Sequence, residues 1–213
     1  MNKIKLVTFD LDGTLVDSGS TIYKATIATF EKLGMKVNLP KDELDKRIGA
    51  HFADIFNDLN IQVDDLEYFI KVYKTIYFDF ISDSTLYPGV IELLEYLHHN
   101  NYKIALLTTK AQGQAELILE HFKLTEYFDY IMGRRPDIKH KPSPEPLLII
   151  AETLNIKPEE TLMVGDTELD IQCGKSAYAL TCGVSYGYRT ESQLEKENPD
   201  YLINSILQLK EIL

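Results

Sequence analysis

The sequence predicts an α/β protein with a doubly wound parallel sheet and a small α-helical cap domain. Three observations predict this fold. From about residue 88 onward, short β-prone apolar runs alternate with stretches of helical periodicity. Residues 16–82 contain helical patterns alone, and they are inserted after the first β-prone run. Polar clusters rich in acids, lysine and threonine follow the predicted strands.

The N-terminal segment predicts a strand and then a helix. The run from Ile4 to Phe9 is short, apolar and β-prone, and Asp10 follows it directly. Ser18 is a suitable N-cap for a helix of about 15 residues that ends before Gly34. The first strand is therefore expected to lead straight into a helical block.

The helical block predicts a second, smaller domain. Apolar residues recur at helical spacing in the stretches 52–59 and 66–80, so the chain reads as purely helical over 16–82. We expect residues 16–82 to form the cap, and residues 1–15 and 83–213 to form the catalytic core. Two chain crossings close together indicate a hinged cap at the carboxyl edge of the sheet.

The remainder of the chain predicts alternating strands and helices. The expected strands are 103–108, 128–132, 161–165 and, as a last short strand, 179–184. The expected helices start after Pro88-Gly89 and at about 114–121, 144–155, 168–175 and 203–213. Pro144 suits the first turn of its helix. This alternation implies parallel strands with helices on both faces, and such sheets bind ligands at their carboxyl edge.

Composition and charge limit the classes of partner. The chain has 213 residues, of which 45% are hydrophobic and 26% charged, as in an ordinary folded domain. Its net charge is −11, which disfavours nucleic acid and anionic lipid as partners. A phosphorylated substrate would also be repelled unless the site holds its own cations. We therefore expect no nucleic acid as partner, and we expect a monomer or homodimer.

Cysteine usage and hydropathy suggest a cytoplasmic protein. Cys173 and Cys182 form neither a CxxC pair nor a disulfide framework, and we expect two reduced thiols. No apolar run approaches the roughly 20 residues of a membrane span, so no membrane association is expected. The residues Met1-Asn2-Lys3 lead directly into a strand-like run, which argues against a signal peptide.

Four polar clusters lie at predicted strand ends or before a helix. They are Asp10-Leu11-Asp12-Gly13-Thr14, Thr108-Thr109-Lys110, Lys141-Pro142-Ser143-Pro144 and Gly165-Asp166-Thr167-Glu168-Leu169-Asp170. An aspartate at a strand end is by itself usually a turn former or a helix cap. Because parallel strands place their carboxyl ends on one edge, all four clusters can meet there. Their joint occurrence indicates one active site.

The residue types in these clusters fit phosphoryl transfer. Clustered carboxylates repel one another, and a hard divalent cation such as Mg²⁺ relieves that repulsion. One carboxylate can attack phosphorus, and a second acid two residues on can protonate the leaving oxygen and later activate water. A hydroxyl and a lysine can hold the phosphoryl oxygens. The clusters supply each of these groups.

On these residues the sequence resembles the haloacid dehalogenase superfamily, in particular its phosphoglycolate-phosphatase-like branch. The segments DLDGTLVDS, LLTTK, KPSPEP and GDTELD are similar to the four family motifs, in order. The resemblance covers nearly the whole chain, to the GVSYGY stretch at 183–188. It implies a Rossmann-like core, a helical cap after the first strand, and a Mg²⁺-dependent phosphatase that hydrolyses small phosphate monoesters through an aspartyl-phosphate.

The resemblance also implies roles for individual residues. Asp10 would be the nucleophile, and Asp12 the general acid and base. Thr108 would hydrogen-bond the phosphoryl group, and Lys141 would pair with the nucleophile and the phosphate.

The implied metal ligands form a second set: Asp10, the backbone carbonyl of Asp12, Asp166 and Asp170. For Asp170 the more natural role is to orient Lys141 or a metal-bound water.

Specificity is expected to come from the cap and the rim of the core. We expect substrate contacts from the following residues: Leu11, Thr109, Lys110, Arg47 and His51. Arg47 and His51 flank Gly49 in a predicted turn between cap helices, where solvent exposure is equally compatible with the pattern. Arg134 and Arg135 follow a predicted strand and could reach the edge of the substrate.

Several other activities fit the same pattern. Dehalogenases of this superfamily lack an acid at the position of Asp12, which argues for phosphoryl transfer here. A phosphomutase of the β-phosphoglucomutase type, an inorganic pyrophosphatase or a 5′-nucleotidase would use the same fold. A non-enzymatic phospho-receiver switch shares the aspartyl-phosphate, but receivers carry the acceptor on a later strand and have no cap.

Overall fold

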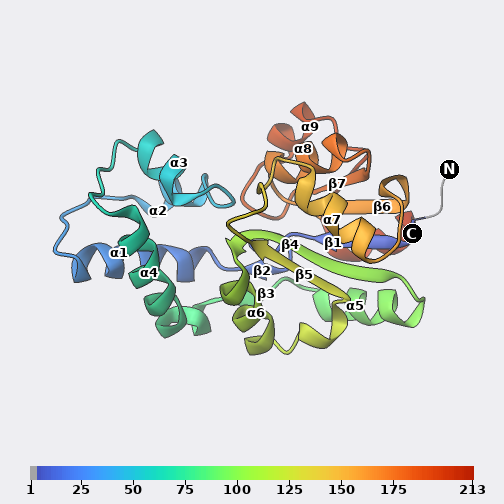
Figure 1. The fold of residues 1–213 in the computed structure, drawn as a ribbon, viewed down its shortest axis with the longest axis horizontal. Helices are drawn as coiled ribbons and strands as arrows, with labels where there is room; N and C mark the ends of the chain where they lie inside the picture. The colour runs from blue at the N-terminus through green and yellow to red at the C-terminus, as the bar shows by residue number, and fades with distance from the viewer. Residues whose placement is uncertain (1–3) are drawn as a thin grey trace.

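The computed structural model confirms the predicted α/β architecture and describes residues 4–213. Met1, Asn2 and Lys3, on which the expectation about a signal peptide depends, lie outside the described residues. The described chain forms two lobes, with the helices α1 to α4 in one lobe and the sheet with its flanking helices in the other (Figure 1).

A six-stranded parallel sheet forms the centre of the larger lobe. Its strands, in spatial order, are β5 (Tyr130–Arg134), β4 (Lys103–Ala111), β1 (Leu6–Phe9), β6 (Thr161–Gly165), β7 (Leu180–Val184) and β8 (Tyr201–Ile203). Phe9 on β1 pairs with Leu106 on β4 and with Val164 on β6. This register brings Asp10 and Asp166, which follow β1 and β6, to a common edge beside the end of β4. The predicted strand 103–108 extends to Ala111, so the predicted cluster Thr108-Thr109-Lys110 lies within β4 and not after it.

Helices cover both faces of this sheet (Figure 1). On one face lie α5 (Val90–His99) and α6 (Gln112–His121), and on the other α7 (Glu145–Thr153) and α8 (Glu168–Ser176). Alternate side chains of β1 separate accordingly, because successive residues of a strand point to opposite faces. Val7 and Phe9 belong to the larger apolar cluster with α5 and α6, and Leu6 to the smaller one with α7 and α8.

The smaller lobe is made of short helices around an aromatic centre. It contains α1 (Gly19–Lys32), α2 (Lys41–Asp45), α3 (Phe52–Asp58), α4 (Leu66–Tyr77) and the 3₁₀ helix η1 (Phe78–Asp83). The rings of Phe30 and Phe69 lie 5.0 Å apart, and those of Phe52 and Tyr73 lie 4.7 Å apart. Burial of such rings stabilises this lobe.

The segment 16–82 is not purely helical, which corrects the sequence prediction. Val16 and Asp17 form β2, which pairs antiparallel with β3 (Thr85–Leu86). The two chain crossings between cap and core therefore run side by side as a ribbon. Each strand has only two residues, too few to produce a recognisable period-2 pattern.

The C-terminal region also differs from the prediction. The strand 179–184 is not the last, because Tyr201–Ile203 adds β8 at the sheet edge. The expected helix 203–213 is reduced to η4 (Ile206–Gln208) and α10 (Leu209–Ile212), and α9 (Glu191–Lys196) was not predicted. Two further 3₁₀ turns, η2 (Thr125–Tyr127) and η3 (Pro158–Glu160), precede β5 and β6. Within residues 4–213, no helix has the length and apolar character needed to cross a membrane.

Candidate active site

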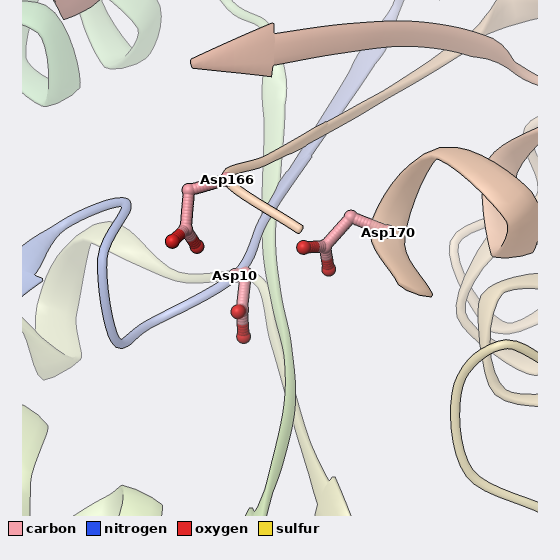
Figure 2. A group of neighbouring side chains, drawn as sticks. All are labelled: Asp10, Asp166 and Asp170. Carbon is pink, nitrogen blue, oxygen red and sulfur yellow. The ribbon is translucent and has the colours of Figure 1, made fainter. Parts of the chain in front are cut away.

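Three aspartates converge at the carboxyl edge of the sheet (Figure 2). Asp10 follows β1, Asp166 follows β6, and Asp170 lies in the first turn of α8. Each offers one carboxylate oxygen within 4.8 Å of the others, and all three side chains are buried. The structure thus brings together residues that are 160 positions apart in the sequence, as the strand-end argument predicts.

Burial and mutual repulsion dominate the electrostatics of this cluster. Burial raises the pKa of Asp10 to about 7 against the opposing effect of Lys141, and Asp170 and Asp12 raise it further. Burial, with the charges of Asp10 and Asp170, also raises the pKa of Asp166 well above its ordinary value. The cluster therefore lacks positive charge, and one lysine does not balance three acids.

Lys141 is the cation within the cluster. Its ammonium lies 3.0 Å from Oδ1 of Asp10 and 2.5 Å from Oδ1 of Asp170. Burial lowers the pKa of Lys141, but the two carboxylates outweigh it and hold that pKa above the ordinary value. Lys141 therefore remains charged at neutral pH.

Asp170 is held by protein donors on both carboxylate oxygens. Oδ1 contacts Lys141, and Oδ2 accepts from the backbone N–H and the hydroxyl of Thr167 at 3.1 and 2.6 Å. The bond from the Thr167 backbone N–H to Asp170 is one half of the capping box of α8. This arrangement suits a residue that orients Lys141 better than one that binds a metal directly.

The side chain of Asp12 lies apart from the acidic cluster. Its Oδ1 accepts a hydrogen bond from the hydroxyl of Ser18, and its Oδ2 lies 3.0 Å from the ammonium of Lys110. The hydroxyl of Tyr188 in turn accepts from the backbone N–H of Ser18 at 3.0 Å. Ser18 thus lies at the predicted N-cap of α1, but its hydroxyl donates to Asp12 and makes no capping hydrogen bond.

The other core residues predicted for the site lie near it in different ways. Thr108 is buried, and its hydroxyl accepts from the backbone N–H of Lys110 at 3.3 Å. Lys110 lies over the ring of Tyr77, with its ammonium 4.6 Å from the ring centroid. Thr109 donates to the carbonyl of Gly49 in the cap at 3.0 Å. The side chain of Leu11 is fully buried, which leaves its backbone for any substrate contact.

The two cap residues predicted to bind substrate have different positions. His51 lines a cavity of about 260 Å³ between the cap turn and the core, together with Thr109, Arg134 and Lys141. Arg47 is not among the lining residues of that cavity. Its guanidinium donates to the carboxylate of Glu43 at 2.9 Å, within the cap. Arg47 thus stabilises α2 in this structure.

The turn 46–50 of the cap is seated on the core. Besides the bond from Thr109 to Gly49, the Arg189 guanidinium donates to the Ile48 carbonyl at 3.3 Å. Arg189 is itself fixed by Glu168, whose carboxylate accepts from it at 2.7 and 3.1 Å. These contacts hold the cap against the edge where the acids converge.

Sequence reasoning missed the residues that support Asp166. The backbone N–H of Tyr188 donates to its Oδ2 at 2.8 Å, and the Thr14 hydroxyl donates to its Oδ1 at 3.3 Å. A Cβ at Gly13 would lie 2.2 Å from Oδ2, and one at Gly187 would lie 2.4 Å from the Gly13 carbonyl. The two glycines of the GVSYGY stretch are a signal of close backbone approach, but no local pattern identifies Asp166 as the partner.

The cluster fits a hard divalent cation. Its donors are carboxylate oxygens, the ligand type that Mg²⁺ prefers. Oδ1 of Asp10 is buried and has no well-directed hydrogen bond within residues 4–213, although Lys141 pairs with it electrostatically. A bound cation would provide this buried oxygen with a partner and would offset its repulsion from the second buried acid, Asp166.

A helical lobe beside the carboxyl edge of a parallel sheet, with this buried set of acids between strand ends, defines the class of capped α/β hydrolases. Comparison with known proteins makes the class specific. The family model for haloacid dehalogenase-like hydrolases matches residues 7–184. The chain belongs to this family, and it is an enzyme of the phosphatase type, as its motifs predict.

The similarity between this chain and individual relatives extends over almost the full length of each relative. The chain is 34% identical over 212 residues to pyrophosphatase PpaX of Halalkalibacterium halodurans, covering 99% of this chain and 97% of that protein. It is 35% identical over 213 residues to pyrophosphatase PpaX of Bacillus mycoides, with the same coverage. The solved structure of a haloacid dehalogenase-like hydrolase family protein from Streptococcus pneumoniae gives a TM-score of 0.88 at 26% identity, covering 100% of this chain and 99% of that one.

Proposed function

We propose that this enzyme is a Mg²⁺-dependent phosphatase that hydrolyses a small phosphorylated metabolite through an aspartyl-phosphate on Asp10. The observation that carries the proposal is the separation of two kinds of acid. Asp10 lies in the buried cluster with Lys141, whereas the carboxylate of Asp12 is held outside that cluster by Ser18 and Lys110. A nucleophile and a separate acid and base are what two-step phosphoryl transfer requires.

In the first step, a carboxylate oxygen of Asp10 attacks phosphorus and the bond to the leaving oxygen breaks. Asp12 donates a proton to that oxygen, so the leaving group departs neutralised. Lys141 and the Thr108 hydroxyl hold the phosphoryl oxygens, where negative charge develops. Asp170 keeps Lys141 in place through the 2.5 Å contact.

In the second step, Asp12 accepts a proton from water, and the water oxygen attacks phosphorus of the aspartyl-phosphate. The bond between phosphorus and Asp10 breaks, which restores the carboxylate and releases phosphate. When bound, Mg²⁺ would supply positive charge that offsets repulsion among the acids and the phosphoryl oxygens. We propose Asp10, Asp166 and the Asp12 carbonyl as its protein ligands, with Asp170 as a positioning group.

Pyrophosphate is the substrate that we propose first. The sequence prediction placed phosphoglycolate ahead of pyrophosphate, but relatives at 34–35% identity over nearly their full length carry the name pyrophosphatase. In pyrophosphate the leaving group is itself a phosphate, and the same two steps apply. The domain division at residues 15/16 and 82/83 is part of the proposal, with residues 16–82 acting as a cap that excludes water.

The test compares phosphate release by the wild-type protein, Asp10→Asn and the control Asp17→Asn. Asp17 is an exposed carboxylate on β2, close in sequence but outside the acidic cluster. We expect Asp10→Asn to lose nearly all turnover of pyrophosphate, while circular dichroism shows an intact fold and Asp17→Asn remains active. Retention of more than a few percent of activity by Asp10→Asn would exclude covalent catalysis at Asp10.

A further inference from the structure

A cavity beside the acidic cluster carries positive charge that the proposed chemistry does not use. This cavity, here called the rim cavity, has a volume of about 260 Å³ and is lined by Gly49, His51, Thr109, Arg134, His140 and Lys141, among others. Its lining includes a single carboxylate, that of Asp54. In a chain with net charge −11, such a local excess of cationic and protonatable groups is unusual.

Arg134 is the permanent charge of the rim cavity that is available to a ligand. Lys141 already pairs with Asp10 and Asp170. The arginine ion pairs found within residues 4–213 involve Arg47 and Arg189, and none involves Arg134. A guanidinium at the end of β5 is therefore free to bind an anion with two hydrogen bonds.

The imidazole of His51, which also lines the rim cavity, carries a hydrogen-bond donor without a partner within residues 4–213. Its Nδ1 accepts from the backbone N–H of Ala53 at 3.3 Å, which leaves the proton of the neutral ring on Nε2. Nε2 is buried and has no partner within residues 4–213. A buried donor without an acceptor is unfavourable by about 1–3 kcal/mol, so this position favours a ligand oxygen.

His140 lines the rim cavity from the core side. Its ring is nearly parallel to that of His51, with centroids 6.4 Å apart. Because its Nδ1 lies 2.9 Å from the carbonyl of Lys141, which can only accept, Nδ1 carries a proton. Burial, followed by the charges of Arg134 and His140, lowers the pKa of His51.

We propose that the rim cavity binds a second anionic group of the substrate, a phosphate or a carboxylate on the leaving-group side, through Arg134 and His51. The inference rests on the proposed function, because it places the transferred phosphoryl group at Asp10. Lys141 connects the two positions, since it contacts Asp10 and also lines the rim cavity. The substrate class is therefore small molecules with two anionic groups joined by a short bridge.

The size of the rim cavity supports a small leaving group. Drug-sized ligands generally occupy cavities of about 300–1,000 Å³, and this one is smaller. A phosphate or glycolate group suits it better than a nucleoside does. The rim cavity would thus distinguish substrates by charge, whereas the acidic cluster handles any phosphoryl group.

The experiment measures kcat and KM for three substrates: pyrophosphate, phosphoglycolate and methyl phosphate, whose leaving group is small and uncharged. The variant is Arg134→Met, and the control is Arg135→Met. Arg135 is the adjacent arginine, whose Nε donates to the Gln112 side chain at 3.1 Å, and it is not among the lining residues. Thermal unfolding of each variant checks that the fold is retained.

We expect Arg134→Met to lower the ratio of kcat/KM for pyrophosphate to that for methyl phosphate by about tenfold, mainly through KM. Arg135→Met should leave the ratio unchanged. His51→Gln provides a second, independent variant and should lower the same ratio by a smaller factor. If phosphoglycolate shows the loss and pyrophosphate does not, the second anion is a carboxylate, and the reverse result identifies a phosphate.

Unchanged ratios for both anionic substrates in Arg134→Met and His51→Gln would overturn the inference. So would an equal loss on all three substrates, because that result indicates a general structural effect. Failure of the proposed function has a different signature: the wild-type protein would turn over none of the three compounds, or Asp10→Asn would remain active.

Discussion

Gly49 is the position where a single methyl group should interfere with cap closure. It lies in the turn between α2 and α3, with a backbone φ of +100°. A Cβ added there would lie 2.9 Å from Cγ2 of Thr167, in the loop between β6 and α8. Thr167 cannot retreat freely, because its hydroxyl and backbone N–H both bind Asp170.

The magnitude follows from two separable effects of Gly49→Ala. An alanine in the left-handed region is strained by about 1–2 kcal/mol, and this strain exists whether the cap is open or closed. The contact with Thr167 exists only when the cap is closed. If relieving it costs about 1.4 kcal/mol, near the centre of the range for single substitutions, the ratio of closed to open cap falls about tenfold. We therefore expect kcat/KM to fall by roughly 5–30-fold.

Gly34→Ala separates the two effects. Gly34 follows α1 in the same cap, with a φ of +70°, and a Cβ there would meet no atom within 4 Å. The assay is kcat/KM for phosphate release together with urea unfolding of both variants. Both should lose about 1 kcal/mol of stability, but only Gly49→Ala should lose activity. Equal activity in the two variants, or an equal loss in both, would refute closure of the turn onto Thr167 as a catalytic requirement.

Two further predictions follow from the buried titratable groups. Burial raises the pKa of Asp10 from 3.8 to about 7, so the metal-free protein should lose stability as pH rises from about 4 to 7. Urea unfolding in EDTA should therefore show that the free energy of unfolding of Asp10→Asn increases relative to that of the wild type across that pH range. A difference that stays constant with pH would contradict this. Burial also raises the thiol pKa of Cys173 and Cys182 to about 12, so both should react with a disulfide reagent only after unfolding; rapid labelling of the native protein would show otherwise.

The strand ends were predictable because burial leaves a strong local signal. The strand Thr161–Gly165 has the bounds that its apolar run predicts, and Asp166 follows it. Since parallel strands end at a common edge, the proximity of Asp10 and Asp166 required no knowledge of side-chain packing. The acidic cluster is thus the part of the site that sequence patterns determine best.

The supporting contacts were not predictable from local patterns. Ser18 has the sequence features of an N-cap, yet in the structure its hydroxyl binds Asp12, which only the tertiary arrangement decides. The three residues of β8 join the sheet edge through pairing with β7, and so short a run carries little signal of its own. Tyr188 contacts Asp166 through its backbone N–H, an interaction independent of residue type.

The orientation of the cap residues was likewise not predictable from local sequence patterns. Arg47 and His51 flank one turn, and the sequence treats them alike, but the helix α2 provides Glu43 as a partner for Arg47 four positions away. His51 caps α3 through Nδ1, and its ring lines the rim cavity. Which side chain faces the core depends on the orientation of the turn relative to the sheet, which no local pattern specifies.

The central claim concerns a covalent bond at Asp10, and mass spectrometry of the acid-quenched enzyme addresses it directly. Asp12→Asn lacks the group that activates water, so the phosphoryl group should accumulate on the protein after mixing with Mg²⁺ and p-nitrophenyl phosphate, whose leaving group needs no proton from Asp12. We predict a mass increase of one phosphoryl group, located by peptide mapping to Asp10, that is absent in a variant also carrying Asp10→Asn. Steady phosphate release by Asp12→Asn without any such adduct, or an adduct on another residue, would contradict the mechanism.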